Sequence, residues 1–149
     1  MAKYGIGQAI TRREDQRLLT GTGRYLDDLV LPGRVFAAFV RSPHPRARIV
    51  SVDGTNATLM PGVLAVYSGA DVLADDLGAM PINTALRNAA GKPMSAPPYY
   101  ILATDEARFV GQAVAVVIAE TRVQAEDAAE QVIVEYEELP AFTTIEAAT

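Results

Sequence analysis

The chain holds few of the side chains that enzymes use for chemistry. Its 149 residues include one histidine, His44, and no cysteine. The lack of cysteine excludes disulfides, thiol nucleophiles and cysteine-ligated metals, and one histidine cannot build a histidine metal site within the chain. His44 could act as a general base, but no Gly-x-Ser-x-Gly motif accompanies it, and we do not expect the nearby Ser42 to act as its nucleophile. We therefore predict no catalytic residue and expect His44 to hydrogen-bond locally or at an interface.

Other candidate motifs are equally incomplete. Gly21 and Gly23 are spaced as in a dinucleotide loop, but they follow a predicted helix, and Leu26 stands where a third glycine belongs. Gln112 lies between Gly111 and a predicted buried strand, where it either presents its amide to a cleft or closes a turn. Pairs of adjacent acids could bind Mg²⁺ or Ca²⁺, but they lack EF-hand spacing and we interpret them as turn residues and solvated ends. We predict no metal-binding or cofactor-binding residue. The acid pairs are Asp27–Asp28, Asp75–Asp76, Asp105–Glu106 and Glu137–Glu138.

The charge is unevenly distributed along the chain. Thirteen Lys and Arg against eighteen Asp and Glu give a net charge of −5. Residues 1–50 have a net charge of +5 and residues 51–149 one of −10. We interpret the basic part as an arm that faces an acidic surface, because no basic run or basic–aromatic pattern favours nucleic acid. No apolar run approaches the roughly 20 residues of a membrane span. The start also lacks a signal-peptide core, so we expect a cytoplasmic protein.

The apolar pattern predicts an N-terminal arm at residues 1–33, with a short helix near 13–19, and a core at residues 34–149. Strands and helices mix without regular alternation, which favours an α+β fold: a mixed sheet with a few short helices in a single domain. Ala57 and Leu59 are expected to face the core, and Thr121 to cap a helix with Gln124 as its capping-box partner. The proline-rich loop 78–100 is expected to be mobile or to lie against something outside the chain. The predicted strands are residues 35–40, 48–53, 63–67, 113–119 and 132–136, and short helices are predicted at residues 55–59 and after Thr121.

Six sequence blocks carry a family resemblance. The block REDQRLLTGTGRYLDD at residues 13–28 resembles the opening of the molybdenum-binding large subunits of the xanthine dehydrogenase, aldehyde oxidase and carbon monoxide dehydrogenase family. FVRSPH followed by ARI at residues 39–49 is similar to the next block. The remaining blocks follow in the family's order and extend the resemblance over nearly the whole chain. They are PGVLAV with GAD at 61–71, LATD at 102–105, VGQAVA at 110–115 and EYEELP at 135–140.

The resemblance implies the N-terminal α/β-hammerhead domain of such a subunit, closest to the bacterial carbon monoxide dehydrogenase-like members with separate subunits. Family members hydroxylate carbon centres with oxygen from water, or oxidise carbon monoxide. The implied partners are the subunit's own C-terminal molybdopterin domain, a medium subunit with FAD and a small subunit with 2Fe-2S clusters. The molybdopterin-type molybdenum cofactor and the catalytic glutamate belong to later domains. The isolated chain, one domain of a longer subunit or the product of a truncated or split gene, is therefore expected to be inactive.

The domain is expected to pack on the molybdopterin domain and to wall the substrate funnel, with His44, Arg46, Gly111 and Gln112 as the possible interface or funnel residues. Family members often have a second histidine two positions after the first, where this chain has Arg46. The alternative hypothesis is a free-standing protein-interaction module without catalysis, in which the basic first fifty residues and the loop 78–100 bind partners. Exposed strand edges also make a homo-oligomer plausible.

Overall fold

The structure is a computed structural model that describes residues 12–81, 86, 87, 90–94 and 96–146. The chain divides into two compact units, residues 1–34 and residues 35–149. In the first unit, helix α1 (Asp15–Leu19) ends at Thr20, and Gly21 follows with a φ of +70°. This left-handed conformation is one that glycine adopts without strain, so Gly21 ends the helix as the sequence predicts. The described residues of this unit also form the 3₁₀ helix η1 (Leu26–Asp28).

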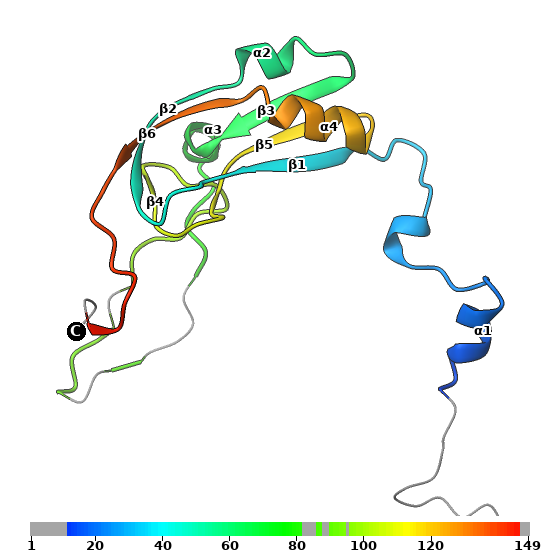
Figure 1. Cartoon of the computed structure of the whole chain (residues 1–149), viewed down its shortest axis with the longest axis horizontal. Helices are drawn as coiled ribbons and strands as arrows, with labels where there is room; N and C mark the ends of the chain where they lie inside the picture. The colour runs from blue at the N-terminus through cyan, green and yellow to red at the C-terminus, as the bar shows by residue number, and fades with distance from the viewer. Residues whose placement is uncertain (1–11, 82–85, 88–89, 95, 147–149) are drawn as a thin grey trace, which may run out of the picture. The chain divides into compact units, whose positions relative to one another are not determined.

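The second unit contains two three-stranded antiparallel sheets, in the orders β1-β5-β3 and β4-β2-β6 (Figure 1). The α+β class is confirmed, and the strands expected to form a mixed sheet separate into these two antiparallel sheets. The strands of the first sheet are β1 (Phe36–Arg41), β3 (Val63–Ser68) and β5 (Ala113–Ala119). Those of the second are β2 (Ala47–Asp53), β4 (Glu106–Ala107) and β6 (Ile133–Glu138).

Strand β5 occupies the centre of the first sheet, as its uninterrupted apolar sequence predicts. Its side chains alternate between the two faces of the sheet, and Ala115 and Val117 point into the core. Helix α4 (Arg122–Ala129) packs over this face, mainly against β1 and β5 (Figure 1). Ala125 and Ala128 are buried in the contact, and such small side chains let the helix approach the sheet closely. The core therefore lies between α4 and one face of the sheet β1-β5-β3.

The start of α4 follows the N-cap part of the predicted capping pattern. The Thr121 hydroxyl accepts a hydrogen bond from the Gln124 backbone N–H at 3.3 Å, which satisfies one of the free donors of the first turn. The same hydroxyl lies 2.8 Å from the Gln124 side-chain oxygen and donates to it. Thr121 is thus confirmed as the N-cap residue. The Gln124 side chain bonds the Thr121 hydroxyl, whereas the predicted capping box requires a bond to the Thr121 backbone N–H.

Helix α2 (Thr55–Thr58) was predicted to turn both Ala57 and Leu59 toward the core, and only one of the two residues does so. Ala57 is fully buried in the core, as expected, but Leu59 is 79% exposed. The prediction for Leu59 was wrong because successive helical residues are about 100° apart, so a residue two positions after Ala57 lies on nearly the opposite side. In this unit, α3 (Gly69–Ala74) and the short strand β4 were not predicted.

The described parts of the loop 78–100 are tied together by backbone hydrogen bonds. The Met80 N–H donates to the Tyr99 carbonyl at 2.8 Å, and the Met94 N–H donates to the Leu86 carbonyl at 3.0 Å. Residues 82–85, 88–89 and 95 lie outside the described residues. Among the helices that the structure does describe, none has the length and apolar character needed to cross a membrane.

Candidate functional site

The turn between β1 and β2 lies beside the segment that leads into β5. The Ser42 N–H donates to the Gln112 carbonyl at 2.9 Å, and the Ser42 carbonyl accepts from the Gly111 N–H at 2.8 Å. The Arg41 side chain adds a bond from Nη1 to the Gly111 carbonyl at 2.8 Å. Residues that are about seventy positions apart in the sequence are thereby held side by side, and the four candidate residues gather at this end of the two sheets.

Gln112 closes a turn, which is the structural one of its two predicted roles. Its side chain is buried, and its amide oxygen accepts a hydrogen bond of 2.6 Å from the Arg108 backbone N–H. The backbone N–H of Gln112 donates to the Phe109 carbonyl at 3.2 Å. Gly111, with a φ of +89°, supplies the left-handed conformation that this turn requires. The Gln112 amide oxygen is therefore committed to the backbone of its own loop.

His44 is partly buried against the second sheet. Its ring centroid lies 4.9 Å from that of Tyr136, with the rings tilted by 59°, and its Nδ1 lies 3.5 Å from a carboxylate oxygen of Glu138. Ser42 does not act with the imidazole: its hydroxyl accepts from the His44 backbone N–H at 3.1 Å and lies 3.2 Å from the His44 carbonyl. The expectation that Ser42 and His44 form no nucleophile–base pair is consistent with these contacts, since nucleophilic catalysis needs a direct hydrogen bond between the two side chains.

The Tyr136 hydroxyl is buried beneath this turn and has no hydrogen-bond partner of good geometry among the described residues. Burial raises the pKa of the Tyr136 phenol, because the charged form would lose its solvation. The nearby Ser42 hydroxyl works in the opposite direction on this pKa and has the smaller effect. Tyr136 therefore stays neutral at physiological pH, and its ring supports the packing of His44.

Arg46 joins three segments of the chain. Its Nε lies 2.5 Å from Oε1 of Glu106 in β4, and its Nη1 donates to the Pro140 carbonyl at 3.2 Å. Arg108 lies on the other side of Glu106, with Nη2 4.0 Å from Oε2, and it also donates from Nη1 to the Pro98 carbonyl at 3.2 Å. A surface depression borders this network, and its lining residues are Pro45, Arg46, Pro97, Glu106, Arg108, Ala141 and Phe142.

The Arg46–Glu106–Arg108 network was missed by sequence reasoning, which interpreted Glu106 as part of a solvated acid pair. Its side chain is only 19% exposed and contacts both arginines. The pattern around Glu106 offered no signal, because its partner Arg46 is sixty residues earlier in the chain. The network holds the C-terminal segment, β4 and the end of the loop 78–100 together. None of these contacts places a base beside a nucleophile.

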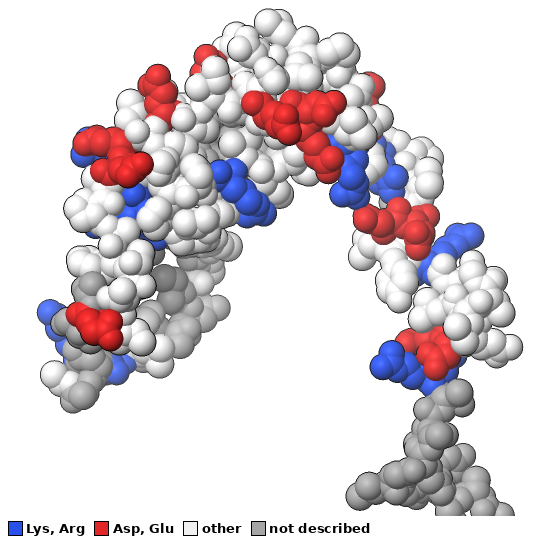
Figure 2. Space-filling view, in the orientation of Figure 1, with Lys and Arg blue, Asp and Glu red and all other residues white. Residues whose placement is uncertain are grey.

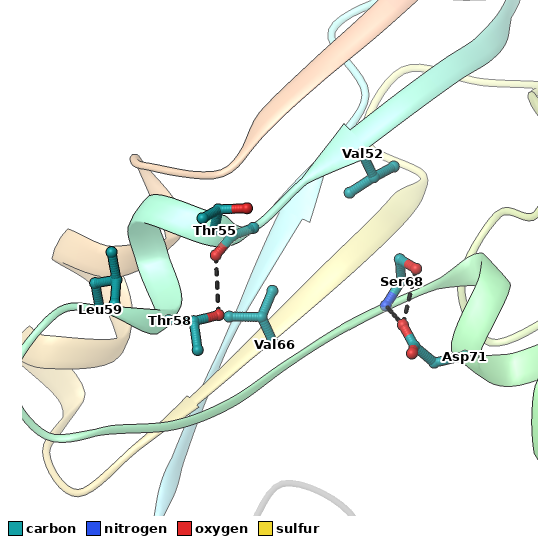
Figure 3. A pocket seen from close by; sticks show the side chains of 8 residues that line it. Val52, Thr55, Thr58, Leu59, Val66, Ser68 and Asp71 are labelled. Atoms are coloured by element: carbon teal, nitrogen blue, oxygen red, sulfur yellow. Dashed lines mark hydrogen bonds between the residues drawn. The ribbon is translucent and has the colours of Figure 1, made fainter.

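A second pocket lies between the β2–α2 segment and β3, and its polar side chains are bonded locally (Figure 3). The Thr58 hydroxyl donates to the Gly54 carbonyl at 2.9 Å. The Asp71 carboxylate accepts from the Ser68 N–H at 2.7 Å and from the Ser68 hydroxyl at 2.8 Å, which caps the start of α3. These two hydrogen bonds lower the pKa of Asp71. The pocket is therefore lined by helix caps and valines, an arrangement typical of structural packing.

Comparison with known proteins identifies the family of this chain. A family model described as aldehyde oxidase and xanthine dehydrogenase, a/b hammerhead domain, matches residues 20–140. The chain belongs to this family. The expectation of a hammerhead domain, made from the six sequence blocks, is therefore confirmed.

Relatives of this hammerhead domain are large subunits of oxidoreductases. The chain is 42% identical over 134 residues to the nicotine 6-hydroxylase large subunit of Paenarthrobacter nicotinovorans, covering 90% of this chain and 16% of that protein. It is 42% identical over 136 residues to the carbon monoxide dehydrogenase large chain of Afipia carboxidovorans, covering 91% and 16%. The crystal structure of quinoline 2-oxidoreductase from Pseudomonas putida 86 matches with a TM-score of 0.81 and 49% identity, covering 99% of this chain and 18% of that one. The hammerhead chain thus spans about a sixth of the length of these relatives.

Proposed function

We propose that this chain is the α/β-hammerhead domain of a molybdenum hydroxylase large subunit of the xanthine dehydrogenase, aldehyde oxidase and carbon monoxide dehydrogenase kind. In this role it packs on the molybdopterin domain and forms part of the wall of the substrate funnel. The observation that carries the proposal is the match over 99% of the chain to an oxidoreductase of known structure. We assign the interface or funnel to the loops that carry His44, Arg46, Gly111 and Gln112, in which the buried Gln112 fixes the turn rather than facing a partner.

We propose that the described residues of this chain do not themselves hold a molybdenum cofactor. Within the described residues there is no group of three or more His, Cys, Asp or Glu side chains that could hold a metal ion. The polar side chains at the candidate site are also used within the chain, with Gln112 bonded to Arg108 and Arg46 bonded to Glu106. Our proposal places the cofactor in the other domains of the full subunit.

The proposed partners follow from the same reasoning. Relatives include a subunit of the 6-hydroxypseudooxynicotine dehydrogenase complex, so the family contains subunits of larger assemblies. We extend this to a medium subunit with FAD and a small subunit with 2Fe-2S clusters, in a cytoplasmic enzyme. The role left to this chain is to shape and support a site whose reactive groups lie elsewhere.

An immunoblot of the source cells with an antibody against this domain tests the proposal. We expect the antibody to detect a polypeptide several times larger than 15.9 kDa, which comigrates with the other subunits in size-exclusion chromatography. The band should also coincide with molybdenum in the column fractions. A band at 15.9 kDa that elutes alone and without molybdenum would overturn the proposal and favour a free-standing interaction module.

A further inference from the structure

The sheet β1-β5-β3 is apolar on both of its faces. One face is covered by α4, which packs over Ala115 and Val117. On the opposite face, the strand register places Phe39, Val116 and Tyr67 in one row across the three strands. Residues that are directly opposite in an antiparallel pair share a face, so these three side chains are neighbours. We call this row, with the adjacent Ala37 and Ile118, the outer face of the sheet.

The outer face is open at its centre. Phe39 is 45% exposed and Tyr67 is 46% exposed, although both are large aromatic side chains within strands. One end of the face is closed by α3 and by the segment at Ile101 and Leu102, which together form a groove with it. The charged side chains that line this groove are both acidic. Asp71 is engaged in the cap of α3, and Asp75 stands at the rim.

The composition of the strands indicates that both faces are covered in the assembled protein. An antiparallel sheet with one face in water alternates apolar and polar side chains, whereas a sheet buried on both faces is apolar throughout. β5 has the sequence AVAVVIA and the first five residues of β1 are FAAFV, with no polar residue in either. By contrast, acidic side chains gather over α4, on the other side of the sheet (Figure 2). The row Phe39, Val116 and Tyr67 is itself uncharged, and at its edge the Arg41 guanidinium lies 5.5 Å from the centroid of the Phe39 ring. An apolar centre with charge at its edge is typical of a permanent interface.

We propose that the outer face of the sheet β1-β5-β3 docks the remaining part of the same large-subunit polypeptide. This inference rests on the proposed function and adds the surface through which the domain is held. The occupant is indicated by the relatives, in which this domain is only 16% to 18% of a single chain, so a covalently linked partner is always present beside it. The docked segment should be apolar opposite Phe39 and Tyr67 and should bring a basic side chain near Asp75.

The absence of cysteine from the chain makes the test direct. We would introduce single cysteines by Phe39→Cys and Tyr67→Cys on the outer face, and by Val123→Cys on α4 as a matched control, since Val123 is apolar and 64% exposed. Each variant would be compared as the 149-residue chain and as a replacement for the matching segment of the quinoline 2-oxidoreductase chain. The readout is the rate of maleimide labelling at the introduced cysteine, followed by peptide mass spectrometry.

We expect all three cysteines to react rapidly in the 149-residue chain. In the chimeric large subunit, the cysteines at positions 39 and 67 should react at least about tenfold more slowly, because a buried thiol reacts only when the structure opens locally. The cysteine at position 123 should keep its rate within about threefold. A chimera that assembles while positions 39 and 67 react as fast as in the 149-residue chain would overturn the docking surface and leave the proposed function standing.

Two further outcomes separate the hypotheses. If the chimera carrying the unaltered domain fails to assemble with the other subunits while the host enzyme does, the proposed function fails as well. If the 149-residue chain is a dimer in which the cysteine at position 39 is protected, the occupant is a second copy and our assignment is wrong.

The variant Phe39→Asp provides an independent test. It should reduce recovery of the assembled chimera at least about fivefold, because a buried unpaired charge is costly. The control variant Val123→Asp should not reduce this recovery.

Discussion

Gln112, Arg46 and Glu106 show how single polar side chains hold distant segments of this domain together. The Gln112 amide fixes the loop that leads into β5. Arg46 bonds both to Glu106 and to the Pro140 carbonyl, and so connects β4 with the chain beyond β6. A hydrogen bond to a charged group contributes more than a neutral one, particularly where solvent is partly excluded. We infer that the polar residues at this end of the domain serve stability and shape.

Arg46→Ala should therefore destabilise the domain more than a typical change at a surface arginine. It removes the ion pair with the largely buried Glu106, and we expect the free energy of unfolding to fall by about 1–2 kcal/mol, a range that allows for solvent screening at the half-exposed guanidinium. Urea denaturation followed by circular dichroism measures this. Arg48→Ala is the matched control, because its ion pair with Glu137 is exposed on both sides and should contribute less than about 1 kcal/mol. Equal losses in the two variants would contradict the prediction.

Some of the candidate residues could be predicted from the sequence, and others could not. His44, Gly111 and Gln112 stand out locally, beside prolines or before an apolar run, and the structure brings them together. Glu106 and Tyr136 carry no such signal, because their environments depend on partners far away in the sequence. Sequence patterns reveal turn residues and caps, whereas ion pairs between distant strands depend on the tertiary fold.

Helix α3 begins at Gly69, where the backbone is in close contact with a neighbouring segment. A Cβ atom added at Gly69 would collide with the Ala103 carbonyl and lie 2.7 Å from the Thr104 Cα. Both obstacles are backbone atoms, which cannot rotate away as a side chain does. Gly69→Ala should lower the free energy of unfolding by about 1–3 kcal/mol, the usual cost of overpacking. Gly78→Ala has open space around its Cβ and should stay within about 0.5 kcal/mol. Thermal unfolding of both variants would decide, and a neutral Gly69→Ala would contradict the close contact.

The cap of α3 predicts a pH dependence. Hydrogen bonds from the Ser68 N–H and hydroxyl lower the pKa of Asp71 below its ordinary value of 3.8. A carboxyl whose pKa is lower in the folded state contributes stability above its unfolded pKa and loses that contribution as the pH falls through its folded pKa. Asp71→Asn should therefore be less stable than the wild type at pH 7, and the difference should shrink below about pH 3.8. Urea unfolding between pH 7 and pH 3 measures this, and a constant difference would refute it.

The elements themselves were predictable to different degrees. β5 and α4 follow directly from a continuous apolar run and from a threonine cap followed by buried alanines. α3 was not predicted, because Ser68, Gly69 and Asp71 are common turn residues as well as capping residues. β4 is two residues long and exists because the edge of β2 pairs with it, so no local pattern could predict it.

At the scale of the whole molecule, the sheet β1-β5-β3 carries the stability of the second unit on one face and offers an apolar surface on the other. The inner face with α4 forms the core, which holds Ala57, Val117 and Ala128. The outer face is the surface that we assign to the rest of a large subunit. This division explains how a small domain can have a real core and still keep large aromatic residues such as Phe39 and Tyr67 exposed.

The two units predict how stability is divided along the chain. Every residue that is buried among those described lies in residues 35–149, and none of the described residues 12–34 is buried. Since burial of apolar surface is the main stabilising term, deletion of residues 1–34 should change the free energy of unfolding of the remainder by less than about 1 kcal/mol. Urea denaturation of residues 35–149 and of the whole chain, followed by near-ultraviolet circular dichroism, provides the comparison. Val117→Ala in the whole chain is the positive control, with an expected loss of about 2 kcal/mol or more. If the deletion costs as much as the loss of this core valine, the first unit takes part in the core, and the division of stability is wrong.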